Sequence, residues 1–141
     1  TTTGNQGSAT PVQVVGVGGT GLLSGVAKVV SDGYVVGGTI CALLTSGNVD
    51  CWGYGAYGQL GNGSFTTTAT PVQVVGIGGT GLLSGVAQVV SDGSSSSAIP
   101  GTFCALLTSG NVDCWGYDAP GELGKPTGSP GSATPVQVVK P

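Results

Sequence analysis

Charged residues are scarce in this sequence. Of its 141 residues only nine are charged, three Lys and six acidic residues, and it contains neither Arg nor His. A typical soluble domain carries about four times this share of charge. Without a basic patch a protein cannot neutralise phosphates, so we expect no nucleic-acid binding. The lack of His and the scarcity of Lys leave no catalytic triad or metal constellation, so we expect no enzyme activity, no cofactor and no metal site.

Long apolar runs and helical patterns are missing too. No apolar run approaches the roughly 18 residues that a membrane-spanning helix requires, so we expect no membrane span. No window of the sequence combines a sustained 3.6-residue apolar period with helix caps. The chain should therefore contain essentially no helix.

Glycine, proline and valine are abundant instead. Gly and Pro together account for 37 residues (29 + 8), a share that alone would suggest low complexity. However, many of the 20 Val residues lie in short runs such as "PVQVV" and "VAKVV". Val is stiff at χ1 and packs well on a pleated surface, so these runs favour β-strands.

Internal repeats organise the whole chain. "ATPVQVV" occurs three times, at Ala9–Val15, Ala69–Val75 and Ala133–Val139, and "GGTGLLSGVA" occurs twice. The block "CALLTSGNVDCWGY" occurs unchanged at Cys41–Tyr54 and Cys104–Tyr117. One unit is therefore about 60 to 64 residues long, and such internal repetition indicates a fold built from repeated structural units.

Each unit contains four short apolar segments separated by turn residues, which predicts four strands. The predicted strands are Val26–Val30, Thr39–Thr45, Asn48–Gly53 and Thr70–Gly76, then Val86–Val90, Thr102–Thr108, Asn111–Gly116 and Thr134–Lys140. Four strands per repeat is the arrangement of a β-propeller blade. We therefore predict an all-β fold of two four-stranded antiparallel blades, residues 17–76 and 77–141. One extra N-terminal strand lies within residues 1–16, at Thr10–Val15, and has no blade of its own.

The sequence also resembles a known family. "ALLTSGNVDCWGYGAYGQLGNG" followed by "TPVQVV" resembles the repeat of the regulator-of-chromosome-condensation family, particularly its cysteine-containing, secreted bacterial versions. The matching elements are the "ALLT" strand, the turn, "WG" and "GQLG" at Gly58–Gly61. The second copy departs from them, with "GELG" at Gly121–Gly124, and the His that often precedes "AL" is absent. The resemblance implies propeller blades, but no residues matching the exchange-factor activity of the eukaryotic namesake are visible.

The spacing of the four cysteines predicts two disulfides. If Leu44 pairs with Asn48, Gly47 can take the left-handed conformation of a three-residue hairpin turn. Cys41 then lies opposite Cys51, at a distance that a disulfide can bridge, and Cys104 lies opposite Cys114. One zinc ion held by all four thiols, or reduced structural thiols, are the alternatives. Disulfides would place the chain in an oxidising compartment, so we expect an extracellular or cell-surface protein.

Several other residues have both a structural and a functional interpretation. Trp52 and Trp115 are expected to pack between blades, although either could stack on a sugar or a partner. Asp50 and Asp113 are expected on solvated faces rather than in acid–base roles. Asn62 begins a glycosylation sequon and is a candidate for modification.

Two blades do not close a ring, which predicts association. Open sheet faces and unpaired strands act as templates for other copies, and contacts between two different surfaces can build filaments. We therefore expect an extracellular structural protein whose subunits associate head to tail into a surface filament or sheath. The unpaired first strand can fold across its own molecule, fray, or join a neighbour's sheet as a strand donor. Val12 and Val14 at one end and Val136 and Val138 at the other are the expected interface residues. The alternative is a fragment of a larger secreted propeller that binds a glycan or another extracellular protein.

Overall fold

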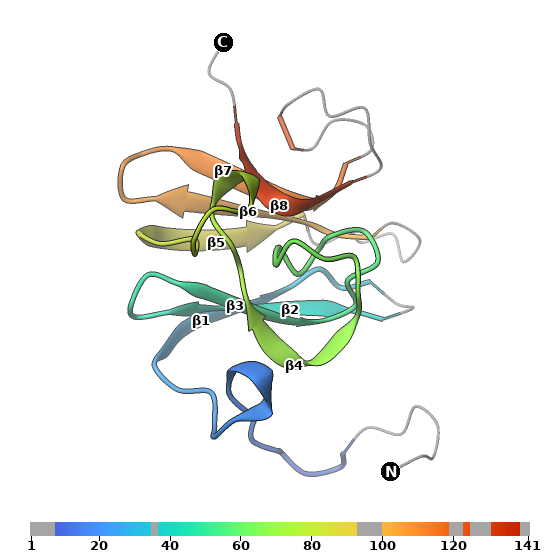
Figure 1. The fold of residues 1–141 in the computed structure, drawn as a ribbon. Helices are drawn as coiled ribbons and strands as arrows, with labels where there is room; N and C mark the ends of the chain where they lie inside the picture. Colours follow the sequence, from blue (N-terminus) through green and yellow to red (C-terminus); the bar gives the residue numbers. More distant parts are fainter. Residues whose placement is uncertain (1–7, 35–36, 93–99, 119–122, 125–130, 139–141) are drawn as a thin grey trace.

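The computed structural model describes residues 8–34, 37–92, 100–118, 123–124 and 131–138. They form two four-stranded antiparallel sheets with strand orders β1-β2-β3-β4 and β5-β6-β7-β8, one per predicted blade, which confirms the predicted fold class. Each strand pairs with the next in the sequence, and the two sheets stack face to face (Figure 1). The strands of blade 1 are β1 (Val26–Ser31), β2 (Thr39–Leu44), β3 (Val49–Gly53) and β4 (Thr68–Gln73). Those of blade 2 are β5 (Val86–Ser91), β6 (Thr102–Leu107), β7 (Val112–Tyr117) and β8 (Gly131–Gln137).

The hairpin between β2 and β3 has the predicted register. The Leu44 N–H donates to the Asn48 carbonyl at 2.9 Å, and Gly47 has a φ of 86°, which only glycine adopts readily. Hydrogen-bonded and non-hydrogen-bonded pairs alternate along an antiparallel ladder, so Cys41 and Cys51 form a non-hydrogen-bonded pair. Such pairs approach closely, and here the two Cα atoms are 4.1 Å apart.

Both expected disulfides, Cys41–Cys51 and Cys104–Cys114, are present. Since all four sulfurs are bonded to one another, they are not available as thiolate ligands for zinc.

The N-terminal "TPVQVV" copy differs from the prediction. Thr10–Val15 is not a strand in the structure, and its one ladder contact is an isolated bridge between Val15 and Leu22. A strand needs a neighbour, and in this molecule β3 already has β2 and β4 on its two sides. Residues 1–7 of the predicted N-terminal unit and residues 139–140 of the last predicted strand lie outside the described residues.

The links before β1 and β5 contain the described helical residues. These are two single 3₁₀ turns, η1 (Val17–Gly19) and η2 (Ile77–Gly79), in the two "GGTGLLSGVA" regions. In the two links the Gly16 and Gly76 N–H groups donate to the Gly21 and Gly81 carbonyls, both at 3.1 Å. Within the described part of the chain, neither helix is long enough to cross a bilayer.

Candidate functional site

The core of the molecule is the joint between the two sheets. Blade 1 contributes one face of its sheet, which we call a disulfide face: Val30, Cys41, Leu43, Val49, Cys51 and Val72. The opposite kind of face, which we call a Trp face, consists of Val74, which directly follows β4, and of Leu83, Val86, Val89, Phe103 and Trp115 of blade 2. Phe103 stacks on Trp115 with ring centroids 6.1 Å apart. The joint thus brings a disulfide face against a Trp face.

Hydrogen bonds across the joint fix how the blades sit on each other. They run from Trp115 Nε1 to the Gln59 carbonyl (2.9 Å), from Asn48 Nδ2 to the Leu83 carbonyl (2.9 Å) and from the Val86 N–H to the Gly47 carbonyl (3.0 Å). Asp32 Oδ2 also accepts a hydrogen bond from the Gly101 N–H at 3.3 Å. These groups belong to the repeat, so the repeat encodes the joint as well as the blades.

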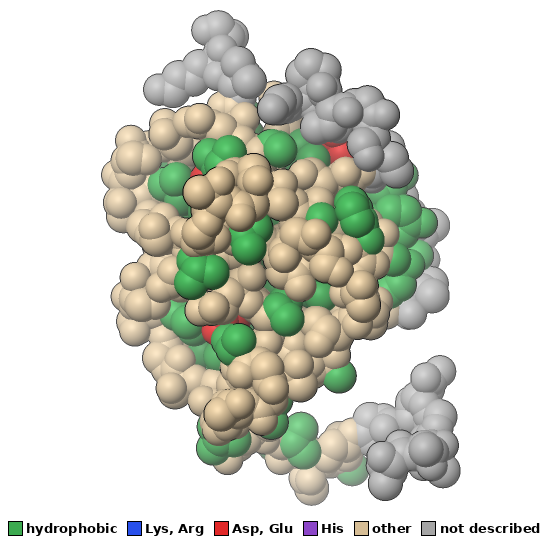
Figure 2. All heavy atoms as spheres, in the orientation of Figure 1, with side chains coloured by type: hydrophobic (Ala, Val, Ile, Leu, Met, Phe, Trp, Pro, Cys, Tyr) green, Lys and Arg blue, Asp and Glu red, His purple; other side chains and the backbone are tan. Residues whose placement is uncertain are grey.

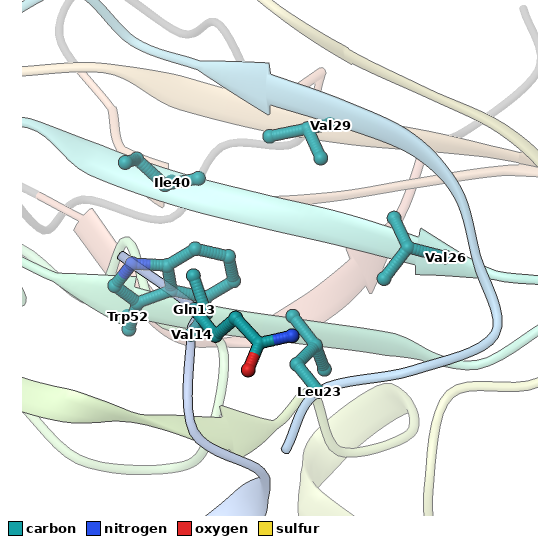
Figure 3. A pocket seen from close by; sticks show the side chains of 7 residues that line it. All are labelled: Gln13, Val14, Leu23, Val26, Val29, Ile40 and Trp52. Atoms are coloured by element: carbon teal, nitrogen blue, oxygen red, sulfur yellow. The ribbon is translucent and has the colours of Figure 1, made fainter. Parts of the chain in front are cut away.

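The repeat places a second Trp face at the open end of blade 1. It consists of the residues equivalent to those of the joint: Val14, Leu23, Val26, Val29, Ile40 and Trp52. Together with Gln13 they line a hollow of about 350 Å³ (Figure 3). Val29 is 58% exposed here, whereas its equivalent Val89 is 1% exposed inside the joint. The apolar surface that blade 2 buries against blade 1 is therefore open on blade 1.

A second disulfide face lies at the open end of blade 2. Its residues are Val90, Cys104, Leu106, Val112, Cys114 and Val136. Leu106 is 41% exposed, whereas its equivalent Leu43 is 7% exposed in the joint. The two ends of the molecule thus carry the two complementary halves of the joint that lies at its centre.

Two of the predicted interface residues lie on these faces. Val14 belongs to the open Trp face, and Val136 pairs with Cys114 on the open disulfide face. Val12 is 72% exposed in the N-terminal segment, and Val138 is half-buried just after β8. Their role in an interface remains a prediction.

Most residues of the open faces were not predicted as interface residues, among them Val29, Ile40 and Leu106. The repeat could have identified them, because each is equivalent to a residue of the joint. That equivalence can be used only once the residues of the joint are known.

Trp115 packs between the blades as expected, whereas the expected packing partner of Trp52 is not present in the single molecule, where Trp52 lines the open Trp face. Asn62 is half-buried and accepts a hydrogen bond from the Ser64 N–H at 3.2 Å. Its modification is untested.

The prediction that Asp50 and Asp113 lie on solvated faces is wrong. Both side chains are buried, and one carboxylate oxygen of each has no hydrogen-bond partner. Burial raises the pKa of both carboxyl groups. The expectation failed because alternation along the strand places the two carboxylates on the Trp faces, beside Trp52 and Trp115. The joint covers Asp113, and Asp50 is buried even on the open Trp face. Among the described residues no group of His, Cys, Asp or Glu could hold a metal ion.

A row of tyrosines lies at one end of the strands of both blades. Tyr34, Tyr54, Tyr57 and Tyr117 are consecutive neighbours, with ring centroids 5.6, 6.2 and 5.4 Å apart, and all four are half-buried. Tyr57 comes from blade 1 and meets Tyr117 of blade 2 edge to face. The row is absent from the sequence prediction because its members are scattered along the chain.

Comparison with known proteins agrees with the repeat and the fold. Residues 46–99 match the regulator of chromosome condensation (RCC1) repeat. This stretch includes β3, β4, η2 and β5, so the family repeat spans the joint between the blades.

Two solved structures have a similar fold. The crystal structure of human WBSCR16 matches 72% of this chain with 24% identity and a TM-score of 0.57. The crystal structure of Kap60 bound to yeast RCC1 (Prp20) matches 73% with 20% identity and a TM-score of 0.54. The chain covers 23% and 21% of the length of those two chains. The repeat match and the two similar folds together support a propeller repeat protein of the RCC1 type.

Proposed function

We propose that this chain is a protein-binding unit that acts through its two open blade faces. Its partner is a further blade of the same kind, supplied by a second copy of the chain. The observation that carries the proposal is the repeat equivalence between the open faces and the two halves of the buried joint. A disulfide face and a Trp face already fit each other inside the molecule, so the same two faces of different copies should fit as well.

The polar groups of the joint are also repeated at the open ends. Asn111 and Gly110 of blade 2 are equivalent to Asn48 and Gly47, which bond across the joint. A Cβ atom at Gly47 would lie 3.3 Å from the Gly85 nitrogen, whereas one at Gly110 would meet nothing within 4 Å. The space that blade 2 fills beside Gly47 is therefore open beside Gly110.

Contact between two different faces is heterologous, so copies would associate head to tail, into a ring if the rotation closes and a filament if it does not. Figure 2 shows apolar side chains scattered over a surface with little charge, which offers weak long-range repulsion between copies. The two disulfides favour an oxidising location, and we place this assembly outside the cell. A protein-binding role is consistent with the similar structure of yeast RCC1 (Prp20), in which that protein is bound to Kap60.

Charge placed on an open face tests the proposal. Val29→Glu should block the Trp face of blade 1, and Leu106→Glu should block the disulfide face of blade 2, because a carboxylate would be desolvated in the joint. Phe65→Glu is the matched control, since Phe65 is 56% exposed and lies on neither face. We expect sedimentation velocity to show concentration-dependent association of the non-reduced wild type and of the control, and monomers for both face variants. Monomeric wild-type protein at high concentration would refute the proposal.

The tyrosine row supports a second candidate function, the binding of a glycan or another extracellular protein at that end of the strands. Aromatic faces stack on sugar rings, and the row offers several faces in sequence. Glycan-array binding that is lost in Tyr54→Ala but retained in Val29→Glu would favour this function. If the wild type binds no glycan on the array, the glycan-binding version of this function is refuted.

A further inference from the structure

The N-terminal segment Ser8–Gln13 shares its sequence and a local hydrogen bond with the two fourth strands but is not in a sheet. "SATPVQVV" at residues 8–15 repeats residues 132–139 and, apart from its first residue, residues 68–75. In the segment Ser8 Oγ donates to the Thr10 carbonyl at 2.6 Å, and the Thr10 N–H donates to Ser8 Oγ at 3.2 Å. The fourth strands begin with the same kind of hydrogen bond. The Thr68 hydroxyl donates to the Thr70 carbonyl at the start of β4, and the Ser132 hydroxyl donates to the Thr134 carbonyl at the start of β8. The segment therefore has the side-chain hydrogen bond with which β4 and β8 begin.

The segment is also anchored as β4 is anchored. The Leu23 N–H donates to the Val14 carbonyl at 2.9 Å, as the Leu83 N–H donates to the Val74 carbonyl at 2.9 Å. Val74 lies in the joint, and the chain before it is β4, which pairs with β3 of blade 1. Val14 occupies the equivalent position on the open Trp face. If another blade docked on that face, the residues before Val14 would lie beside the third strand of the docked blade, as β4 lies beside β3.

In a joint between two copies, that third strand is β7 of the docked copy, and β8 already pairs with it. Val14 and Val138 are both equivalents of Val74, which is 1% exposed, so the joint has room for only one of them. We propose that the fourth strand is exchanged at the joint. Residues 8–13 of one copy pair with β7 of the next copy and displace its β8. The inference rests on the proposed head-to-tail association, and it favours the N-terminal segment because its Val14 is already seated on the docking face.

The exchanged strand must donate the backbone hydrogen bonds that β8 donates to β7 in the single molecule. The Val138 N–H donates to the Val112 carbonyl at 2.8 Å, and N–H directions alternate along a strand. The Val136 N–H therefore points to β7 as well, while Pro135 occupies a position where no donor is required. Val12 is the equivalent of Val136, so in the exchanged strand its N–H would donate to β7 of the neighbouring copy.

Amide hydrogen exchange of the full-length, non-reduced protein tests the exchange of strands. Peptides covering residues 9–13 and 132–137 can be told apart by mass because their flanking residues differ. We expect association of the wild type to slow the exchange of amides 9–13 at least tenfold and to accelerate that of 132–137, relative to monomeric Val29→Glu. Residues 68–73 are the internal control and should not change. Association without protection of 9–13, with 132–137 still protected, would overturn the strand exchange while leaving the proposed function standing. Absence of association would overturn both.

A variant of Val12 provides the second test. Val12→Pro removes the N–H that the exchanged strand would donate, and Val12→Ala retains it. Because residues 8–13 pair with no strand in the single molecule, neither change should unfold it. We expect Val12→Pro to weaken association about fivefold to tenfold relative to Val12→Ala, as the loss of one backbone hydrogen bond predicts. Equal association of the two variants would contradict the proposal.

Discussion

Asp50 and Asp113 occupy matching positions in β3 and β7, where each buries a carboxylate oxygen without a hydrogen-bond partner. A charged group in this state destabilises the fold, and each pKa is raised by burial. Between the pKa of the unfolded chain and the raised pKa of the folded state, the folded protein binds more protons. The free energy of unfolding should therefore decrease as the pH rises through this window.

Neutral isosteres should remove this pH dependence. We expect Asp50→Asn and Asp113→Asn each to increase the free energy of unfolding at pH 7 by about 1 kcal/mol, because an uncharged amide costs less to bury. Urea unfolding from acidic to neutral pH measures both effects.

Asp92→Asn is the matched control for these two variants. Asp92 is exposed and accepts a hydrogen bond from the Thr102 N–H at 3.2 Å, which Asn can also accept. The control should change stability by no more than about 0.5 kcal/mol. A loss of stability in both buried variants at pH 7 would show that the carboxylates are stabilising.

At the scale of the element, the hairpins show how much the sequence could predict. The register of the hairpins could be predicted from a three-residue loop that contains Gly47. The disulfides could then be predicted from the register.

The lack of strand pairing at Thr10–Val15 could not be predicted, because the same sequence forms a strand at β4, where β3 is available to pair with it. The residues of the open faces could not be identified for a similar reason. Val29 and Val89 have nearly the same sequence context, with Lys28 in place of Gln88, but they differ in exposure because only Val89 is covered by the other blade.

The two disulfides lie in identical hairpins but in different surroundings. Cys41 and Cys51 are fully buried in the joint, whereas Cys104 is half-exposed on the open face. Replacing both cysteines of a pair with Ala should cost roughly 2 to 4 kcal/mol of unfolding free energy through loss of the cross-link. The loss should be larger for the pair 41/51, because its sulfurs also pack in the core. Urea unfolding of the two double variants measures the difference, and an equal or opposite order would contradict the account of the joint.

At the scale of the whole molecule, the joint between the blades forms the core, and its two halves recur as the open faces at the two ends of the stack. The matched family repeat includes strands of both blades, and each of the two blades carries one disulfide face and one Trp face. The two sheets stack once (Figure 1), which leaves one Trp face and one disulfide face exposed. Association of copies would repeat the joint that the chain already forms within itself.

The most direct test of this central claim is sedimentation of an equimolar mixture of Val29→Glu and Leu106→Glu. Each variant alone lacks one of the two complementary faces, but the mixture retains one intact face of each kind. The account predicts that the two monomers combine into a 1:1 dimer and that assembly stops there, because the outer faces of that dimer are both blocked. Two monomers that remain separate on mixing, or species larger than a dimer, would contradict head-to-tail association through these faces.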